Sequence, residues 1–157
     1  MAKASSAERF QGAMRVRGFA CEVVELPSSA RTTPEAAQSV GCAVAQIAKS
    51  LVFRSTQSSR PILVIASGAN RVNETLVGEL VGEAIEKADA EFTRRYTGFA
   101  IGGVPPTCHT EPLQTFIDED LLQYQEIWAA AGTPQAVFRL APYDLERMTG
   151  GTVVSIK

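Results

Sequence analysis

The sequence predicts one mixed α/β domain, with a mixed, largely antiparallel sheet and helices packed around it. Its 157 residues, 45% of them hydrophobic, are enough for a single sizeable core. Short stretches of β-forming residues are interspersed with segments of helical periodicity. Because the two kinds do not follow a strict strand–helix–strand alternation, a mixed sheet within the single domain 1–157 is favoured over a purely parallel one.

The chain is expected to begin with a helix and a strand. Residues 5–17 place Phe10 and Met14 at helical spacing before Gly18, a common residue at helix ends. This pattern predicts an amphipathic helix. Residues 19–26 are rich in β-forming side chains, which predicts a first strand.

A second helix and the centre of the sheet should follow. Thr33 before Pro34 is a favourable helix start, and Gly41 marks the expected end of that helix. Residues 46–54 have strand character, and residues 61–66 form a continuous apolar run typical of a strand covered on both faces. We expect this pair, joined by a polar turn, at the centre of the sheet.

The middle of the chain is expected to be helical and then irregular. Asn73 and Asp89 can each cap a helix whose apolar residues recur at helical spacing, and the second helix should end at Gly98. Residues 98–106 contain too much Gly and Pro for a regular strand end. They predict a strand that enters a constrained loop.

The C-terminal third is expected to complete the sheet. Asp118 can cap a short turn, and residues 131–134 can separate two strands. The predicted elements are an extended segment at 115–117, strands at 126–130 and 136–140, a helix at 142–150 and a strand at 152–156.

Charge and cysteine content exclude several classes of protein. A net charge of −2 argues against a protein that coats nucleic acid, so a nucleic-acid partner would have to be gripped locally. Three scattered cysteines suit neither a disulfide framework nor a zinc site, which favours a reducing, cytoplasmic setting. The N-terminus lacks the apolar stretch of a signal peptide, and no run approaches the roughly 20 apolar residues that span a bilayer. The arginines that could contact a nucleic-acid backbone are Arg31, Arg54, Arg60, Arg71, Arg94 and Arg95. Ordinary positions on solvent-exposed faces would account for these arginines equally well.

Lys49 is the first candidate functional residue. The period of a strand places it on one face with Ile47, Leu51 and Phe53, so a lysine interrupts an apolar face. A buried ammonium must find an anion or lose its charge. Lys49 is therefore an anchor for a phosphate or carboxylate, an amine of lowered pKa, or a side chain whose head reaches solvent at the sheet edge.

Residues 102–106 (GGVPP) are the second candidate. Two glycines let a ligand approach the backbone, and two prolines hold the loop rigid. Exposed N–H groups in such a loop can stabilise an oxyanion, although a structural turn between strands has the same composition.

Two further clusters are weaker candidates. Cys108 and His109 would point to opposite sides of an extended segment, which disfavours a catalytic thiol–imidazole dyad. His109 could instead contact a substrate or stabilise its loop. Residues 118–120 (DED) could bind a metal, but a solvated turn with a helix cap is the commoner structure.

Four segments together resemble the YbaK family, also called the prolyl-tRNA synthetase-associated or editing-insertion domain. They are residues 46–53 (QIAKSLVF), 97–106 (TGFAIGGVPP) with His109, 117–121 (IDEDL) and 131–134 (AGTP). The order of these segments matches over nearly the whole chain. The resemblance implies a mixed α/β fold and a free-standing, trans-editing deacylase that hydrolyses mischarged aminoacyl-tRNA without metal or cofactor. Pro105 and Pro106, followed by His109, resemble the free-standing members of this family more than YbaK itself.

The resemblance also implies roles for individual residues. Lys49 matches the lysine expected to hold the 3′-terminal nucleotide of tRNA, and the backbone at Gly102 and Gly103 would receive the aminoacyl carbonyl. The residues expected to line the substrate pocket are Thr32, Thr33, Val104, Pro105, Pro106, His109, Asp118, Gly132 and Thr133. The implied substrate is tRNA-Pro carrying a small amino acid such as Ala, Ser or Thr, and the implied partners are the acceptor end of tRNA and an aminoacyl-tRNA synthetase.

Chemistry is compatible with this activity. An aminoacyl ester is already activated, so a positioned water beside a polarised carbonyl needs no strong nucleophile. Two alternatives stay open: a catalytically silent module that binds aminoacyl-tRNA or a synthetase, and a small-molecule hydrolase that uses Cys108 and is sensitive to thiol alkylation.

Overall fold

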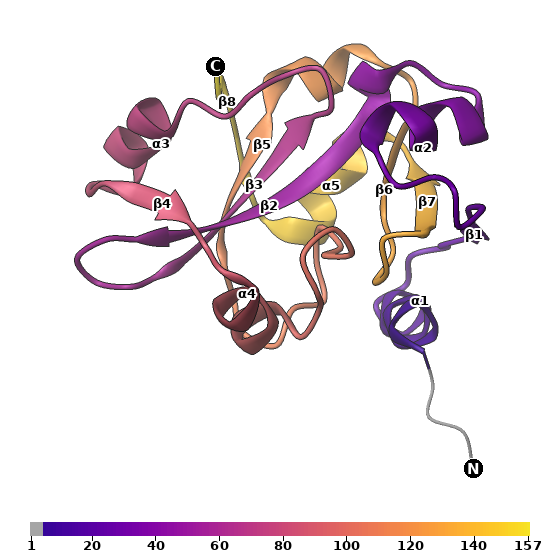
Figure 1. Ribbon diagram of the computed structural model, residues 1–157, viewed down its shortest axis with the longest axis horizontal. Helices are drawn as coiled ribbons and strands as arrows, with labels where there is room; N and C mark the ends of the chain where they lie inside the picture. Colours follow the sequence, from indigo (N-terminus) through magenta and orange to yellow (C-terminus); the bar gives the residue numbers. More distant parts are fainter. Residues whose placement is uncertain (1–4) are drawn as a thin grey trace.

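The computed structural model describes residues 5–157 (Figure 1). The first four residues, part of the stretch expected not to be a signal peptide, lie outside the described residues. The helices are α1 (Ser6–Val16), α2 (Thr33–Val40), α3 (Glu74–Val81), α4 (Ala90–Thr97) and α5 (Pro142–Thr149), with short 3₁₀ helices η1 (Val44–Gln46) and η2 (Glu119–Gln123). The strands are β1 (Val23–Glu25), β2 (Ile47–Ser55), β3 (Pro61–Ser67), β4 (Ile85–Lys87), β5 (Gln114–Asp118), β6 (Ile127–Ala130), β7 (Ala136–Leu140) and β8 (Thr152–Val154).

The strands form one mixed sheet in the order β1-β7-β6-β2-β3-β5-β8. Antiparallel pairs join β1 to β7, β6 to β7 and β2 to β3, whereas β2–β6, β3–β5 and β5–β8 are parallel. The short strand β4 pairs antiparallel with the end of β2. The predicted fold class is confirmed, and β2 and β3 lie at the centre of the sheet as expected.

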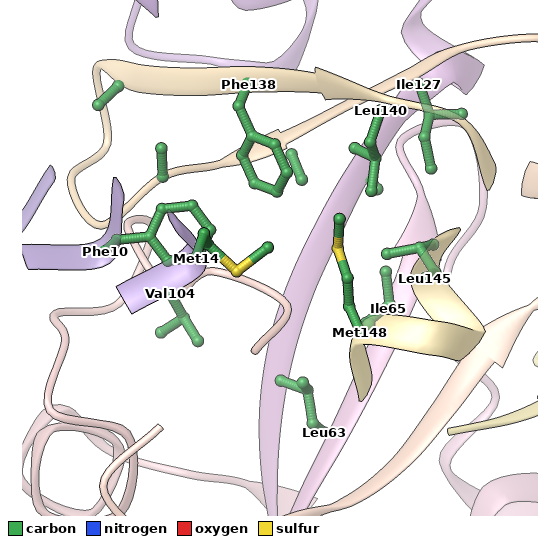
Figure 2. Close-up of a cluster of buried hydrophobic side chains, with 14 of the residues drawn as sticks. Phe10, Met14, Leu63, Ile65, Val104, Ile127, Phe138, Leu140, Leu145 and Met148 are labelled. Carbon is green, nitrogen blue, oxygen red and sulfur yellow. The ribbon is translucent and has the colours of Figure 1, made fainter. Parts of the chain in front are cut away.

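One face of the sheet is covered by α1 and α5. Phe10 and Met14 from α1, and Leu145 from α5, are at most 1% exposed and pack against the strands (Figure 2). Phe10 and Phe138 of β7 stack at 5.1 Å between ring centroids. The apolar face predicted for the first helix thus packs into the larger of the core clusters.

The opposite face is covered by α3 and the C-terminal segment. Phe53 of β2, Val77 of α3 and Ile156 form a second core cluster around the alternate side chains of β3. Apolar residues on both faces explain why β3 is a continuous apolar run, since both of its faces are buried.

Several predicted elements differ from the structure. The expected strand at 19–26 is reduced to β1, a three-residue edge strand that pairs only with β7. The expected strand entering the loop at 98–106 is wrong: the described backbone there consists of turns and irregular structure, held by Phe99 and Val104 in the core. The strand β4 was not predicted because its three residues are too few to show a period.

Helix caps agree with the sequence to within one residue. Asn73 and Asp89 accept hydrogen bonds from the backbone N–H groups of Leu76 and Phe92. The cap of α2 is Thr32 rather than Thr33, since Thr32 Oγ1 accepts from Glu35 N at 3.3 Å. Among residues 5–157, no helix is long and apolar enough to cross a membrane.

Candidate functional site

A cavity of about 850 Å³ opens where β2 changes its pairing partner. On one side, β2 pairs with β6 at Ile47 and Ala48 and with β4 from Phe53 to Ser55. Between these two pairings the strand edge is left to the cavity, and residues 47–53 all line it. The remaining walls come from the start of α2, the segment that leads into α3, the end of β4, α4, the loop after α4, β6, and β7 with the turn before it.

The cavity wall is cationic although the chain carries a net charge of −2. Its charged lining residues are Arg31, Lys49, Arg71, Lys87 and Glu74. None of the four cations forms an ion pair within the described part of the chain, whereas Arg54 and Arg60 pair with glutamates elsewhere on the surface. Unpaired cations in one hollow favour an anionic ligand.

Lys49 lies half-buried on β2, on the face predicted from the sequence. Phe53 on the same face belongs to the cluster under α3, whereas Ala48 belongs to the cluster under α1 and α5. Because successive strand residues point to opposite faces, Lys49 and Ser50 line the cavity from opposite sides of β2. One strand therefore presents two different chemical surfaces to the same cavity.

The glycine loop contacts the cavity through Gly102 and Val104. Gly103 lies behind them: its N–H donates to Ala100 O at 2.9 Å and is engaged within the loop. A Cβ on Gly103 would lie 2.7 Å from Thr133 Cα, so the absence of a side chain lets the loop pack against the turn before β7. Of the two predicted glycines, Gly102 is the one that borders the cavity.

The turn before β7 packs against the glycine loop. Thr133 contacts Gly103, and Gly132 adopts a φ of +110° with its backbone close to Ser6 of α1. Neither residue lines the cavity, although the following Pro134 does. Thr32 and Thr33 at the start of α2 do line it.

The acidic residues Asp118 and Asp120 hold the side chain of Asn70, which lines the cavity. Asp118 is 1% exposed and accepts from Ser67 N and Asn70 Nδ2, both at 2.9 Å. Asn70 Nδ2 also donates to Asp120, which pairs with Lys157 at 2.8 Å. The hydrogen bonds from Lys157 and Asn70 lower the pKa of Asp120. Asp118 therefore reaches the cavity only through Asn70, which lines it.

No group of three or more His, Cys, Asp or Glu side chains within residues 5–157 is arranged to hold a metal ion. The carboxylates of Asp118 and Asp120 are instead committed to the amide, N–H and ammonium donors around them.

Pro106 and His109 line a separate hollow of about 380 Å³, together with Arg17, Thr107 and Cys108. His109 Nε2 donates to Pro105 O at 2.7 Å, which closes the loop on itself. Burial lowers the pKa of His109. Cys108 Sγ contacts Met14 Sδ and Arg17 rather than the imidazole. The structure thus separates His109, Pro105 and Pro106 from the cavity around Lys49.

Sequence reasoning missed several cavity residues. Trp128 is half-buried, packs against the small core cluster of Leu26, Ala30 and Val137, and also lines the cavity. Asn70, Ser50 and Thr93 are short polar residues without a recognisable motif, and only their meeting at this cavity distinguishes them.

Residues 27–148 match the model of the aminoacyl-tRNA editing domain. The chain belongs to the aminoacyl-tRNA editing domain family. The matched segment of this editing domain contains Lys49, the glycine loop and the whole cavity wall named above, which confirms the resemblance noted in the sequence.

Similar proteins agree with this assignment. A crystal structure described as "a putative trans-editing enzyme for prolyl tRNA synthetase" is 49% identical, with a TM-score of 0.93 over 99% of both chains. The uncharacterized protein YwhH of Bacillus subtilis (strain 168) is 27% identical over 82% of this chain and 81% of its own. The proline–tRNA ligase of Limosilactobacillus fermentum (strain NBRC 3956 / LMG 18251) is 34% identical over 59% of this chain, which corresponds to only 17% of the ligase.

Proposed function

We propose that this editing domain is a trans-acting deacylase that hydrolyses the ester bond of mischarged aminoacyl-tRNA. Its proposed substrate is tRNA-Pro carrying a small amino acid such as Ala, Ser or Thr. The observation that carries the proposal is the position of Lys49, which lines the same cavity as Gly102 and Val104 in a wall of unpaired cations. Similarity to the protein described as "a putative trans-editing enzyme for prolyl tRNA synthetase" supports the choice of tRNA.

The cationic wall suits the acceptor end of tRNA. Lys49, Arg71 and Lys87 can contact phosphates near the 3′ terminus, while the rest of the chain is too acidic to hold a long duplex. Binding is therefore local, weak and sensitive to salt.

The reaction needs only positioning and stabilisation of charge. A water molecule attacks the ester carbonyl, and the negative charge of the tetrahedral intermediate falls on the carbonyl oxygen. Collapse expels the ribose oxygen, which takes a proton and restores the free hydroxyl of tRNA, while the amino acid leaves as a carboxylic acid. We assign Lys49 to holding the terminal nucleotide and the N–H of Gly102 to the developing oxyanion.

An activated ester makes a protein nucleophile unnecessary. Cys108 packs against Met14 in the separate hollow, which argues against a thiol mechanism at this cavity. A second hydrolytic site is needed in translation because a synthetic site cannot reject a smaller or near-isosteric amino acid by binding alone.

The first experiment is hydrolysis of tRNA-Pro charged with radiolabelled Ala, Ser, Thr, Cys or Pro by the wild type and by Lys49→Ala. The expected result is release of one or two wrong amino acids, lost in the variant, with Pro retained on its tRNA. Tight binding of the same tRNAs without release by the wild type would instead identify a silent binding module. Unchanged turnover in Lys49→Ala would remove the proposed mechanism.

A further inference from the structure

The side-chain amide of Asn70 is held in one orientation at the cavity wall. Its Nδ2 donates to Asp118 Oδ2 at 2.9 Å and to Asp120 Oδ2 at 2.7 Å. An amide nitrogen has two hydrogens, so it can serve one carboxylate with each. The flipped amide would place its oxygen against two carboxylate oxygens, neither of which is a donor when ionised. The acidic pair therefore fixes which atom of Asn70 is left free.

The free atom is the amide oxygen, Oδ1. Asn70 is half-buried and lines the cavity. Within residues 5–157, the buried side-chain atoms without a hydrogen-bond partner are Ser50 Oγ, Arg54 Nε and Thr93 Oγ1. Asn70 Oδ1 also accepts no hydrogen bond in this range, but it is not closed off from solvent. It can therefore accept a hydrogen bond from a ligand without any rearrangement of the fold.

A second asparagine, three residues later, shows the same side chain in a structural role. Asn73 Oδ1 accepts from Leu76 N at 3.1 Å and caps α3, and Asn73 does not line the cavity. In Asn73 the oxygen stabilises the fold. In Asn70 the nitrogen does so, and the oxygen has no structural task.

The buried carboxylate that holds Asn70 lies in line with Lys49 across the sheet. Continuing the β3–β5 register by one residue places Lys49 and Asp118 in the same row, with one residue of β3 between them. Both point to the same face, because Phe53 and Phe116, two or four residues away on their strands, pack in one core cluster. Adjacent strands lie about 4.8 Å apart, so the two backbones are about 10 Å apart. A ligand held by Lys49 can therefore reach Asn70.

Negative charge at the cavity wall gathers near Asn70. The charged residues that line the cavity are Arg31, Lys49, Arg71, Lys87 and Glu74. Glu74, four residues after Asn70, is the only carboxylate among them and has no ion pair within residues 5–157. Behind Asn70, Asp118 and Asp120 carry two negative charges against the single positive charge of Lys157. The segment that also contains the exposed Arg71 is thus where a positive ligand group meets acceptors.

The end of an aminoacyl-tRNA carries both signs of charge. Its phosphates suit the cations of the wall, and its α-ammonium is one carbon away from the ester carbonyl. A hydrogen bond with one charged partner is about twice as strong as one between neutral groups. The hydrogen bonds from Nδ2 to two carboxylates also polarise the amide and strengthen Oδ1 as an acceptor. Among the donors near the ester, the α-ammonium therefore gains more from Asn70 than a neutral ribose hydroxyl does.

We propose that Asn70 Oδ1 accepts a hydrogen bond from the α-ammonium of the amino acid esterified to tRNA. This inference rests on the proposed deacylase function and names its substrate class, which is esters with a free α-amino group. Asp118 and Asp120 are positioning residues that act through Asn70. Because a single carbon joins the ammonium to the ester carbonyl, the contact also restricts where that carbonyl can lie.

The test compares each amino ester with an analogue in which a hydroxyl replaces the α-ammonium. The pairs are tRNA-Pro charged with alanine or lactate, and with serine or glycerate. Each kcat/KM is divided by the spontaneous hydrolysis rate of the same ester, because the ammonium itself activates the carbonyl. The wild type should prefer the amino ester at least about 10-fold in at least one pair, as expected for loss of a charge-assisted hydrogen bond.

Variants then assign this preference to Asn70. Asn70→Ala should slow hydrolysis of the amino ester about 10-fold and that of its analogue less than about threefold. Asp120→Ala, which keeps Asn70 but releases its amide, should give an intermediate preference. The matched control is Asn73→Ala, which removes an asparagine that caps α3 and should lower the Tm without changing the preference.

Three results separate the possibilities. Equal hydrolysis of both esters in each pair by the wild type would overturn the inference without any variant, even if Asn70→Ala does not fold. An equal loss for both esters in Asn70→Ala would also overturn it, because Asn70 would then serve the ribose, the nucleotide or the fold. Hydrolysis of none of these esters, nor of any other charged tRNA, would contradict the deacylase function itself, which the first two results leave intact.

Discussion

The hollow around Lys49 and the hollow around His109 differ in how their polar groups are used. In the smaller one, the Arg17 guanidinium donates to Thr107 Oγ1 at 2.7 Å and to Met148 O at 2.8 Å, and His109 donates to Pro105 O. In the larger one, the cations have no carboxylate partner within residues 5–157. Paired groups stabilise the fold, while the unpaired cations that line the larger hollow are available to a ligand.

The largest expected effect comes from exchanging a cation in each hollow. Lys49→Ala should lower kcat/KM for aminoacyl-tRNA at least about 100-fold, because the cation that holds the terminal nucleotide beside the reacting ester is lost. Its Tm should change by less than about 2 °C, since Lys49 makes no ion pair within residues 5–157. Deacylation assays and thermal unfolding check both numbers.

Arg17→Ala is the matched control for that variant. Loss of its hydrogen bonds to Thr107 and Met148 should cost about 1 kcal/mol, or a fall in Tm of about 2 to 4 °C, with deacylation unchanged. A loss of activity in Arg17→Ala comparable to that in Lys49→Ala would erase the distinction between the two hollows.

The next effect concerns the two adjacent glycines. Gly103→Ala would place a Cβ 2.7 Å from Thr133 Cα and force the loop away from its support. We expect a destabilisation of about 1 to 3 kcal/mol, together with reduced deacylation, as for other overpacked sites.

Gly102→Ala tests the other glycine. Its Cβ would meet nothing nearer than Pro134 Cγ at 3.7 Å, but the φ of +89° is strained for alanine and should cost about 1 kcal/mol. Urea denaturation of both variants checks the order, and a larger loss of stability for Gly102→Ala would contradict the packing described here.

A smaller effect should appear in the dependence on salt. If the cationic wall contacts phosphates, log kcat/KM should fall linearly with log salt, and Arg71→Ala should reduce the magnitude of that slope by about 0.7. Arg139→Ala, which removes a surface cation that pairs with Glu126, should leave the slope unchanged. Equal slopes for the wild type and Arg71→Ala would exclude a phosphate contact at Arg71.

The smallest effect is the pH dependence of stability from His109. Burial lowers its pKa below the ordinary value of 6.5, so below that pH the unfolded chain takes up a proton more readily than the folded one. Stability should therefore decline as the pH falls through 6.5, and His109→Gln should decline less. Denaturation curves between pH 8 and pH 5 measure the difference, while the pH profile of activity separates it from the cavity.

Local patterns predicted most of the fold. The capping residues, the helix-terminating glycines and the buried run of β3 are decided by neighbours in the chain, so they are readable without tertiary context. Strand β4 and the irregular path from Gly98 to Pro106 depend on what packs against them. Neither could be predicted, because a three-residue pairing and a loop held by Phe99 and Val104 leave no period in the sequence.

The candidate site divides in the same way. Lys49 could be identified from the sequence because it interrupts an apolar strand face, where an unpaired ammonium would be costly to bury. His109 and Pro106 stand close to the glycine loop in sequence, yet the hydrogen bond between His109 and Pro105 turns them into the other hollow.

The sequence by itself determined a mixed α/β fold, its central strand pair and its one interrupted apolar face, because these follow from side-chain period and backbone preference. Only the tertiary structure decided which groups stay unpaired. Ser50 and Thr93 lie 43 residues apart in the sequence, yet both line the same cavity. That cavity exists because the edge of β2 stops pairing with β6 before it begins to pair with β4.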